Sequence, residues 1–266
     1  MSEKFMGADS ASYDEADYII VPIPHDANVS WLSGSAKGPE AVIRASREIE
    51  HYDFETGANI SDYKFATIEP IKYEEIHETV EKIMKRGKMP LSIGGDHSIS
   101  IPILTALPPD VSILHIDAHL DMREEYLGNR QSHACALYEA SKNHEVVHVA
   151  TRSACEEDIE NARKFGNIIA NYKDIEGILH DLSDDVYITF DVDGLDPSIM
   201  PATGIPEPGG MNWREANDLL EAVCREKNIV GMDITELRPQ EGFHACDALV
   251  AKLIMKSIIY IESGGP

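Results

Sequence analysis

Aspartate and histidine residues are concentrated in three short segments, each of which follows a run of apolar residues. The segments read SIGGDHS, DAHLD and DVDGLDP and span Ser92–Ser98, Asp117–Asp121 and Asp191–Pro197. In the second segment Asp117, His119 and Asp121 recur with a period of two, so in an extended backbone their side chains project to the same side. Asp191 and Asp193 repeat this spacing in the third segment. These residues are therefore candidates for one shared polar site.

Four carboxylates in one small volume favour a site for two metal ions. Like charges at close range raise each other's pKa values unless cations compensate them, and two divalent ions would balance four aspartates. Neutral imidazole and carboxylate oxygen are intermediate to hard ligands, which favours Mn²⁺ over the softer metals that thiolates bind. A single Asp-x-His pair could equally cap a helix or stabilise a turn, but three such clusters at successive strand ends indicate a metal site.

One further motif has the spacing of a zinc protease. His144 to His148 read H-E-V-V-H, but the H-E-x-x-H chemistry requires a helix that brings both histidines to one face. The β-branched residues that continue through Val149 predict a strand instead, so we do not expect a zinc site here. The chain also has no G-x-S-x-G, P-loop or G-x-G-x-x-G motif, and readings as a serine hydrolase, a phosphate-binding protein or a dinucleotide-binding protein have no support.

The polar segments need a framework that places the ends of distant apolar runs side by side. Short continuous apolar runs alternate with amphipathic stretches, and seven of these runs are strand candidates: Tyr18–Ile23, Met89–Ile93, Val111–Ile116, Val146–Val149, Asn167–Ala170, Val186–Phe190 and Ile229–Met232. Such strands are buried on both faces, as in a parallel sheet, and a β-α-β-α order covers the sheet with helices on both sides. Ligands bind outside the carboxyl ends of these strands. No linker or repeat divides the chain, so residues 1–266 are expected to form a single domain.

Charge and cysteine content narrow the classes of partner. The chain has 23 Lys and Arg against 47 Asp and Glu, a formal net charge of −24, which would repel nucleic acid and anionic membrane surfaces and attract cations. The four cysteines show no C-x-x-C spacing, as expected for reduced thiols. No apolar run reaches the roughly 18 residues of a membrane span, and the first residues do not resemble a signal peptide. We expect a cytoplasmic protein with a small cationic substrate.

Five motifs together are similar to those of the ureohydrolase family of arginases and agmatinases. They are GGDHS, DAHLD, the stretch Asp191–Gly210, DITELRP at Asp233–Pro239 and GSAKGPEAVIRAS at Gly34–Ser46. The match therefore extends over nearly the whole chain in the family's order. The resemblance implies a three-layer α/β/α fold with a mainly parallel eight-stranded sheet, and an assembly as homo-oligomer, either trimer or hexamer.

The resemblance also implies two manganese ions per chain. One ion would be bound by His97, Asp117, Asp121 and Asp191, and the other by Asp117, His119, Asp191 and Asp193. Asp117 and Asp191 would then bridge the ions. A hydroxide shared by the ions would be the nucleophile, because coordination lowers the pKa of bound water toward about 7, and it would attack the guanidinium carbon.

The family's remaining catalytic positions fall on Glu236 and His133, and we expect both, together with Asp121, to take part in catalysis. Glu236 matches the glutamate that binds the guanidinium, a task that suits a bidentate carboxylate. His133 matches the histidine that shuttles protons, and an imidazole near neutrality could protonate the leaving amine. Many members follow this histidine with Gly-Thr, whereas this chain has Ala134 and Cys135, a variant associated with microbial agmatinase-like proteins.

The expected reaction is the hydrolysis of agmatine to putrescine and urea. Glu124 and Glu125 lie in the loop after DAHLD and would attract the terminal ammonium of agmatine and repel the carboxylate of arginine, while Arg123 and Arg130 favour the opposite preference. The alternatives within the family are arginase, guanidinobutyrase and formimidoylglutamase. A zinc-dependent deacetylase is disfavoured because its adjacent His-His pair is absent from this chain. A non-catalytic metal-binding protein is the remaining alternative.

Overall fold

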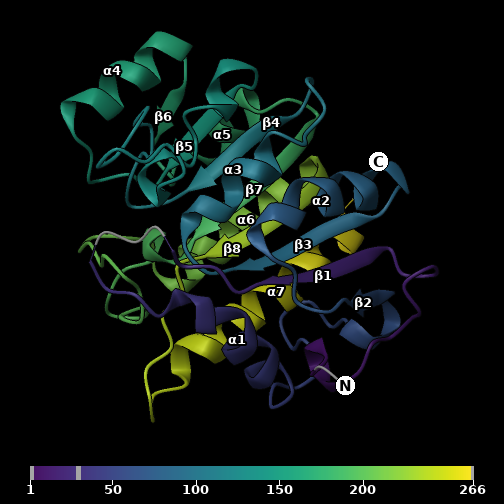
Figure 1. Cartoon of the computed structure of the whole chain (residues 1–266). Helices are drawn as coiled ribbons and strands as arrows, with labels where there is room; N and C mark the ends of the chain where they lie inside the picture. The colour runs from purple at the N-terminus through teal and green to yellow at the C-terminus, as the bar shows by residue number, and fades with distance from the viewer. Residues whose placement is uncertain (1–2, 28–30, 265–266) are drawn as a thin grey trace.

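The computed structural model describes residues 3–27 and 31–264, and its centre is a single parallel sheet of eight strands (Figure 1). The strands lie in the order β2-β1-β3-β8-β7-β4-β5-β6, and every pair is parallel. Their bounds are β1 Tyr18–Ile23, β2 Phe65–Thr67, β3 Met89–Gly94, β4 Ser112–Ile116, β5 Val146–Val149, β6 Ile168–Ala170, β7 Asp185–Asp191 and β8 Asn228–Thr235.

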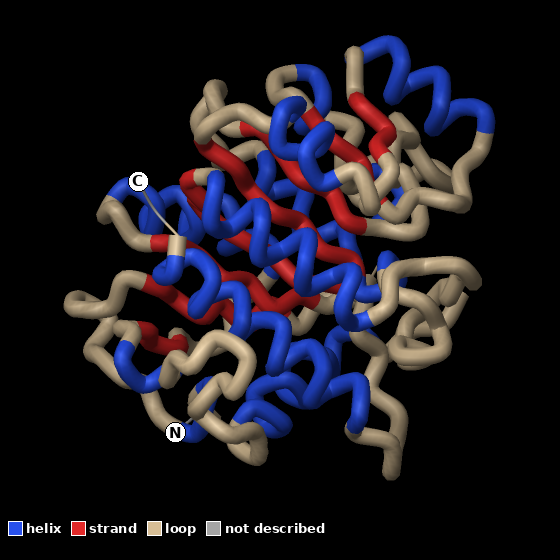
Figure 2. The backbone as a smooth tube through the Cα atoms, turned by 180° about the vertical axis from the view of Figure 1, so that it is seen from behind, coloured by secondary structure: helices blue, strands red, loops and turns tan. Residues whose placement is uncertain are grey.

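Helices cover both faces of this sheet, as the views from the front and from behind show (Figure 1, Figure 2). Their bounds are α1 Gly38–Ser46, α2 Ile76–Lys85, α3 Ser100–Leu104, α4 Glu156–Phe165, α5 Ile175–Asp181, α6 Trp213–Glu226 and α7 Ala245–Ser263. Residues of α1, α5, α6 and α7 pack into one apolar core, and residues of α2, α3 and α4 pack into the other. The fold is therefore a three-layer α/β/α sandwich.

Side chains along each strand point alternately to the two faces of the sheet, and each face therefore has its own apolar core. In β1, Tyr18 and Ile20 contribute to the core beneath α1 and α7, whereas Ile19, Val21 and Ile23 contribute to the core beneath α2 and α3. Every residue of β1 is buried. Successive side chains of a strand point to opposite faces, so a continuous apolar run fits only a strand that is covered on both sides.

The sequence prediction of the fold class is confirmed. All seven predicted strands exist, with ends displaced by at most three residues, and the mainly parallel sheet proves to be parallel throughout its described strands. The strand that the sequence did not reveal is β2, which has three residues and too short an apolar pattern to stand out. Within the described part of the chain, no helix combines the length and hydropathy needed to cross a membrane.

The strand order determines where the polar segments meet. β3, β8, β7 and β4 are consecutive neighbours in the sheet, although they are distant in the sequence. Because all strands are parallel, their carboxyl ends lie at the same edge. The residues that follow these four strands are therefore brought together at the middle of that edge.

Candidate metal centre and active site

The site is built from short turns that begin where four neighbouring strands end. His97 opens a 3₁₀ turn after β3, Asp117 follows β4, and Asp191 is the last residue of β7. The next turn, Val192–Gly194, contains Asp193, and Glu236 follows β8. Each of these five side chains is more than nine-tenths buried, so the sequence has placed four carboxylates and an imidazole in a volume with little water.

The first group of candidate ligands surrounds His97. Its Nδ1 atom lies 3.0 Å from Oδ2 of Asp117, 3.2 Å from Oδ2 of Asp121 and 3.4 Å from Oδ2 of Asp191. Although it is buried, this nitrogen has no hydrogen-bond partner among residues 3–27 and 31–264.

The opposite nitrogen, Nε2, lies 2.9 Å from Oγ1 of Thr189. That hydroxyl donates its own proton to Asp233 at 2.8 Å, so it accepts from His97. Donation at Nε2 leaves the lone pair of Nδ1 directed at the carboxylates, which is the arrangement a divalent ion requires of a histidine ligand.

The second group is centred on His119. Its Nδ1 atom lies 3.1 Å from Oδ2 of Asp193 and 3.4 Å from Oδ1 of Asp117, and the three residues have the proximity expected of a metal site. Backbone N–H groups hold the carboxylates in place. Oδ1 of Asp193 accepts from Ala118 at 3.0 Å, and Oδ1 of Asp117 accepts from His119 at 2.6 Å. Asp117 thus belongs to both groups.

The buried carboxylates of the site repel one another electrostatically. Burial, followed by the charges of Asp193 and Asp117, raises the pKa of Asp191 well above its ordinary value. Burial and the Asp117 carboxylate likewise raise the pKa of Asp193 to about 6. Cations between these side chains would relieve the repulsion, and with the lone pair of His97 Nδ1 this makes the donor set a good fit for two divalent ions.

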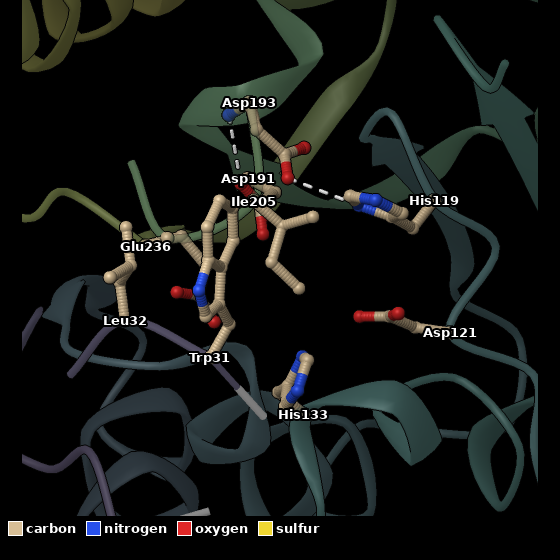
Figure 3. Close-up of a pocket in the computed structure, with 10 residues that line it drawn as sticks. Trp31, Leu32, His119, Asp121, His133, Asp191, Asp193, Ile205 and Glu236 are labelled. Atoms are coloured by element: carbon tan, nitrogen blue, oxygen red, sulfur yellow. Dashed lines mark hydrogen bonds and ion pairs between the residues drawn. The ribbon is translucent and has the colours of Figure 1, made fainter. Parts of the chain in front are cut away.

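A narrow cavity of about 20 Å³ opens beside the carboxylates. Figure 3 shows the side chains that face it, which come from several distant segments. Its walls are formed by Trp31, Leu32, His119, Asp121, His133, Asp191, Asp193, Gly204, Ile205 and Glu236. The structure therefore brings the predicted catalytic residues His133, Glu236 and Asp121 to one cavity with three further predicted metal ligands, His119, Asp191 and Asp193.

Glu236 is held rigidly at the wall of this cavity. Its Oε1 atom accepts a hydrogen bond of 2.8 Å from the backbone N–H of His97, and its own backbone has a φ of 66°, in the left-handed region that non-glycine residues rarely adopt. Burial, and next the Asp96 carboxylate, raise the pKa of Glu236 well above its ordinary value. A bound cation would favour the ionised carboxylate.

A second cavity of about 280 Å³ adjoins the first. The two share His119, Asp121, His133 and Ile205 in their walls. The wider cavity is also lined by Arg123, Tyr126, Ala134, Ser153, Ala154, Cys155 and Asp158. Together they form a route from the carboxylates to a larger space that could contain an elongated substrate.

Glu124 and Glu125, the predicted contacts for the substrate tail, lie outside the described walls of both cavities. Both pair with Arg130, at 2.8 Å for Glu124 and 3.9 Å for Glu125. Arg123 does line the wider cavity. Its guanidinium lies over the ring of Tyr126, 4.5 Å from the centroid, and its Nε atom is 3.8 Å from Asp158.

Several residues of the site were not found from the sequence. Trp31 and Ile205 line the narrow cavity; Trp31 lies outside every motif, and Ile205 lies within the stretch Asp191–Gly210 but has an apolar side chain without reactive groups. His115 forms a possible metal group with His97 and Asp117. The sequence did contain a pattern that points to His115, because this residue precedes Asp117 by two positions and extends the period-two spacing of DAHLD into β4. The H-E-x-x-H stretch is not helical, as expected: its second half, Val146 to His148, lies in β5, and His144 and Glu145 precede that strand.

Comparison with known proteins agrees with this geometry. Residues 16–260 match the model of the Arginase family. The chain is 37% identical to an N(1)-aminopropylagmatine ureohydrolase of Thermus thermophilus, over 95% of this chain and 92% of that protein. It is 30% identical to an agmatinase of Bacillus subtilis, over 97% of this chain and 96% of that protein. The crystal structure of an agmatine ureohydrolase of Thermoplasma volcanium superposes with a TM-score of 0.87 at 31% identity, over 98% of this chain and 94% of that chain.

Proposed function

Because the chain belongs to the arginase family and is a ureohydrolase of the agmatinase type, we propose that it hydrolyses an aminoalkyl guanidine to urea and an amine with two manganese ions. The observation that carries the proposal is that one cavity is lined by buried carboxylates and Glu236, while the Nδ1 lone pair of His97 is directed at the same carboxylates. The carboxylates match divalent cations, and Glu236 matches a guanidinium.

We assign the metal ligands as the sequence predicted them. His97, Asp117, Asp121 and Asp191 would bind one ion, and Asp117, His119, Asp191 and Asp193 the other. When bound, such ions supply a nucleophile by lowering the pKa of water toward about 7. The protein's own contribution is to hold the carboxylates at fixed positions through backbone N–H groups.

Glu236 would orient the substrate. A guanidinium is planar and offers paired N–H donors, so a carboxylate at the cavity wall can bind it in one orientation. The hydrogen bond from the His97 N–H and the buried position of Glu236 restrict the carboxylate's rotation. We expect this to position the guanidinium carbon beside the metal ligands.

His133 would protonate the leaving amine. Its imidazole lies where the two cavities meet, between the guanidinium position and the space for the tail, which is the place where the departing nitrogen would be. The ring of Tyr126 packs edge-on against it, with centroids 6.4 Å apart. A proton transferred there converts a poor leaving group into a neutral amine.

The wider cavity supports a substrate with an elongated tail. Agmatine has a four-carbon aminoalkyl tail, and an aminopropylagmatine carries a longer polyamine. The net charge of −24 would attract either cation. Asp158 and Asp121 add carboxylates to the cavity wall. Glu124 and Glu125 remain proposed contacts for the distal ammonium, which would have to displace Arg130 from them.

A guanidine that carries a carboxylate is the second candidate, because Arg123 lines the wider cavity. A free guanidinium at this position would bind the carboxylate of arginine or 4-guanidinobutyrate. The contacts of Arg123 with Asp158 and Tyr126 offset part of its positive charge. For this reason we prefer an aminoalkyl guanidine as the substrate over a guanidine that carries a carboxylate.

A panel of four guanidino compounds tests the choice between an aminoalkyl guanidine and a guanidine that carries a carboxylate. Urea release from agmatine, N1-aminopropylagmatine, 4-guanidinobutyrate and arginine would be measured with Mn²⁺-loaded protein. We expect kcat/KM for agmatine or for N1-aminopropylagmatine to exceed that for arginine by a factor of at least roughly 10³, which corresponds to about 4 kcal/mol. The reason is that the arginine carboxylate would lose its hydrating water without gaining a hydrogen-bond partner. Preferential hydrolysis of arginine that disappears in Arg123→Met would favour the second candidate, and no urea from any compound would contradict the hydrolase.

A further inference from the structure

A hydrogen-bonded series of two buried histidines and one half-buried asparagine lies behind Asp117 and has no place in the proposed reaction. Nε2 of His115 is 3.0 Å from Oδ2 of Asp117, and Nδ1 of His115 is 2.7 Å from Nδ1 of His148. Nε2 of His148 is in turn 3.1 Å from Nδ2 of Asn167. Both histidines are fully buried, so each nitrogen depends on these partners for its hydrogen bonds.

Three neighbouring strands hold this series in register. His115 in β4 is the direct partner of His148 in β5, and Asn167 immediately precedes β6, the next strand of the sheet. Side chains on paired positions of adjacent strands lie on the same face. His148 is also the last residue of the H-E-x-x-H stretch, which has no function as a zinc motif.

The positions of the protons follow from the distances. A carboxylate accepts only, so the 3.0 Å contact with Asp117 requires that His115 carry its proton on Nε2. Nδ1 of a neutral His115 is then an acceptor. The 2.7 Å contact between the two Nδ1 atoms requires one proton, which His148 supplies, and Nε2 of His148 is left as an acceptor.

Asn167 completes the series with a donor. The hydroxyl of Ser141 donates to the sulfur of Met122 at 3.3 Å, so its oxygen is available to accept from Nδ2 of Asn167 at 2.7 Å. The same amide nitrogen has a second hydrogen for Nε2 of His148. Burial lowers the pKa of His148 well below its ordinary value, in agreement with a neutral ring.

We propose that Asn167 and His148 are positioning residues that hold His115 as a hydrogen-bond donor to Asp117, and thereby hold the carboxylate shared by the two metal groups in one orientation. The inference rests on the proposed function, because it assigns these residues to its metal centre. It also makes His115 a support of Asp117 instead of a metal ligand. Removal of such supporting hydrogen bonds lowers metal affinity by roughly 10- to 100-fold.

The decisive variant is Asn167→Asp, which preserves the shape of the side chain and replaces its donor by an acceptor. A neutral His148 then donates from Nε2 to the new carboxylate and no longer donates to His115. Asn171→Asp is the matched control, because it adds the same charge just beyond the same strand, where the Asn171 oxygen already accepts from Lys173 N–H at 3.0 Å.

Mn²⁺ affinity would be measured directly, by the paramagnetic resonance signal of free Mn²⁺ during titration of the protein. We expect Asn167→Asp to bind Mn²⁺ roughly 10- to 100-fold more weakly and Asn171→Asp to bind it as the wild type does. Should Asn167→Asp fail to fold, His148→Asn retains a donor near the former Nδ1 and His148→Leu does not. His148→Asn should then bind Mn²⁺ roughly tenfold more tightly than His148→Leu.

The outcomes separate the inference from the proposed function. A wild type that binds no Mn²⁺ would contradict the metal centre of the proposed function. A wild type that binds two ions, with unchanged affinity in Asn167→Asp, would overturn only the inference. His115→Phe tests the same point by stoichiometry: two weakly bound ions support a donor to Asp117, whereas a loss of one ion at saturating Mn²⁺ would show that His115 is a ligand.

Discussion

Two residues of the site combine an unusual backbone with a chemical role. Asp121 and Glu236 have φ angles of 50° and 66°, although neither is a glycine. Such conformations cost of order 1–3 kcal/mol each and persist where the surrounding structure determines them. Asp121 directs a carboxylate toward His97 at 3.2 Å, and Glu236 lines the same cavity, so the strain accompanies the directions that the proposed chemistry requires.

Asp191→Ala should remove both metal ions, because Asp191 is the proposed bridge. His97→Ala should mainly weaken one ion, since His97 belongs to one ligand set only. Asp184→Ala is a suitable control, because this exposed residue lies at the opposite end of β7. Metal analysis of the purified variants would measure the outcome, and an active Asp191→Ala protein with two bound ions would contradict the bridging assignment.

His133→Ala should retain two ions while kcat falls by roughly 10²–10⁴, the usual loss when a general acid or base is removed. Glu236→Gln should instead raise KM, because it neutralises the partner of the guanidinium. Steady-state kinetics together with metal analysis separate the two roles. Wild-type turnover in His133→Ala would show that the imidazole is not the proton donor.

At the scale of elements, the long helix α7 fastens a distant loop to the core by a buried ion pair. Lys256 is 1% exposed, and its Nζ lies 3.2 Å from Oδ2 of Asp53 and 2.7 Å from Oε2 of Glu55. Asp53 is itself 2% exposed. A buried charge that loses its partner is costly, whereas the intact pair contributes less than its proximity implies.

Lys256→Met should therefore lower the free energy of unfolding by at most about 3–5 kcal/mol, because Lys252 Nζ, 3.5 Å from Oδ2 of Asp53, still pairs with this carboxylate. The double variant with Asp53→Leu should recover part of this loss, since the buried carboxylate is then removed together with its buried partner. Unfolding in urea would measure both. A Lys256→Met protein as stable as the wild type would show that Lys252 or solvent compensates the charge of Asp53.

The same pair has a defined pH dependence. Burial opposes ionisation of Asp53, but the N–H of Thr56 and the Lys256 ammonium outweigh it and lower the pKa. A lowered carboxyl pKa stabilises the fold above the ordinary value of about 4, and this stabilisation is lost as the pH falls through the lowered pKa. The stability difference between wild type and Lys256→Met should shrink over that acidic range.

At the scale of the whole molecule, all described strands belong to one sheet with a core on each face. We propose on this basis that residues 1–266 are a single domain. We further propose a homo-oligomer, trimer or hexamer, as the family resemblance implies, and light scattering of the purified protein would test this assembly.

Metal removal should make the stability of the protein fall as the pH rises. Burial and neighbouring carboxylates raise the pKa of Asp193 to about 6 and that of Asp191 well above its ordinary value. A carboxyl with a raised pKa binds extra protons in the folded state, so stability is lost as the pH rises from about 4 through that raised value.

Thermal unfolding with a chelator and with Mn²⁺ would measure this effect. We expect the chelated protein to lose roughly 2–3 kcal/mol between about pH 5 and about pH 7.5. Mn²⁺ should abolish most of the loss, because cations replace the protons between the carboxylates. A chelated protein whose stability rises over this range would show that the carboxylates do not repel each other when folded.

Local sequence was sufficient for seven of the eight described strands and for the residues at their ends. Continuous β-branched runs have few alternatives to a strand buried on both faces, and the period-two spacing of Asp117, His119 and Asp121 orients side chains without reference to distant residues. The predicted ligands and Glu236 accordingly lie together in the structure. Their assignment as ligands stays a prediction until metal is measured.

Contacts between segments that are distant in the sequence could not be predicted from local sequence patterns. The pairing of His115 with His148 depends on the adjacency of β4 and β5, and the presence of Arg123 in the cavity wall, with Glu124 and Glu125 outside it, depends on how one loop folds over the sheet edge. Loop residues have no periodicity that assigns them to a face. Their directions follow from packing against segments far away in the sequence, and that packing exists only in the folded chain.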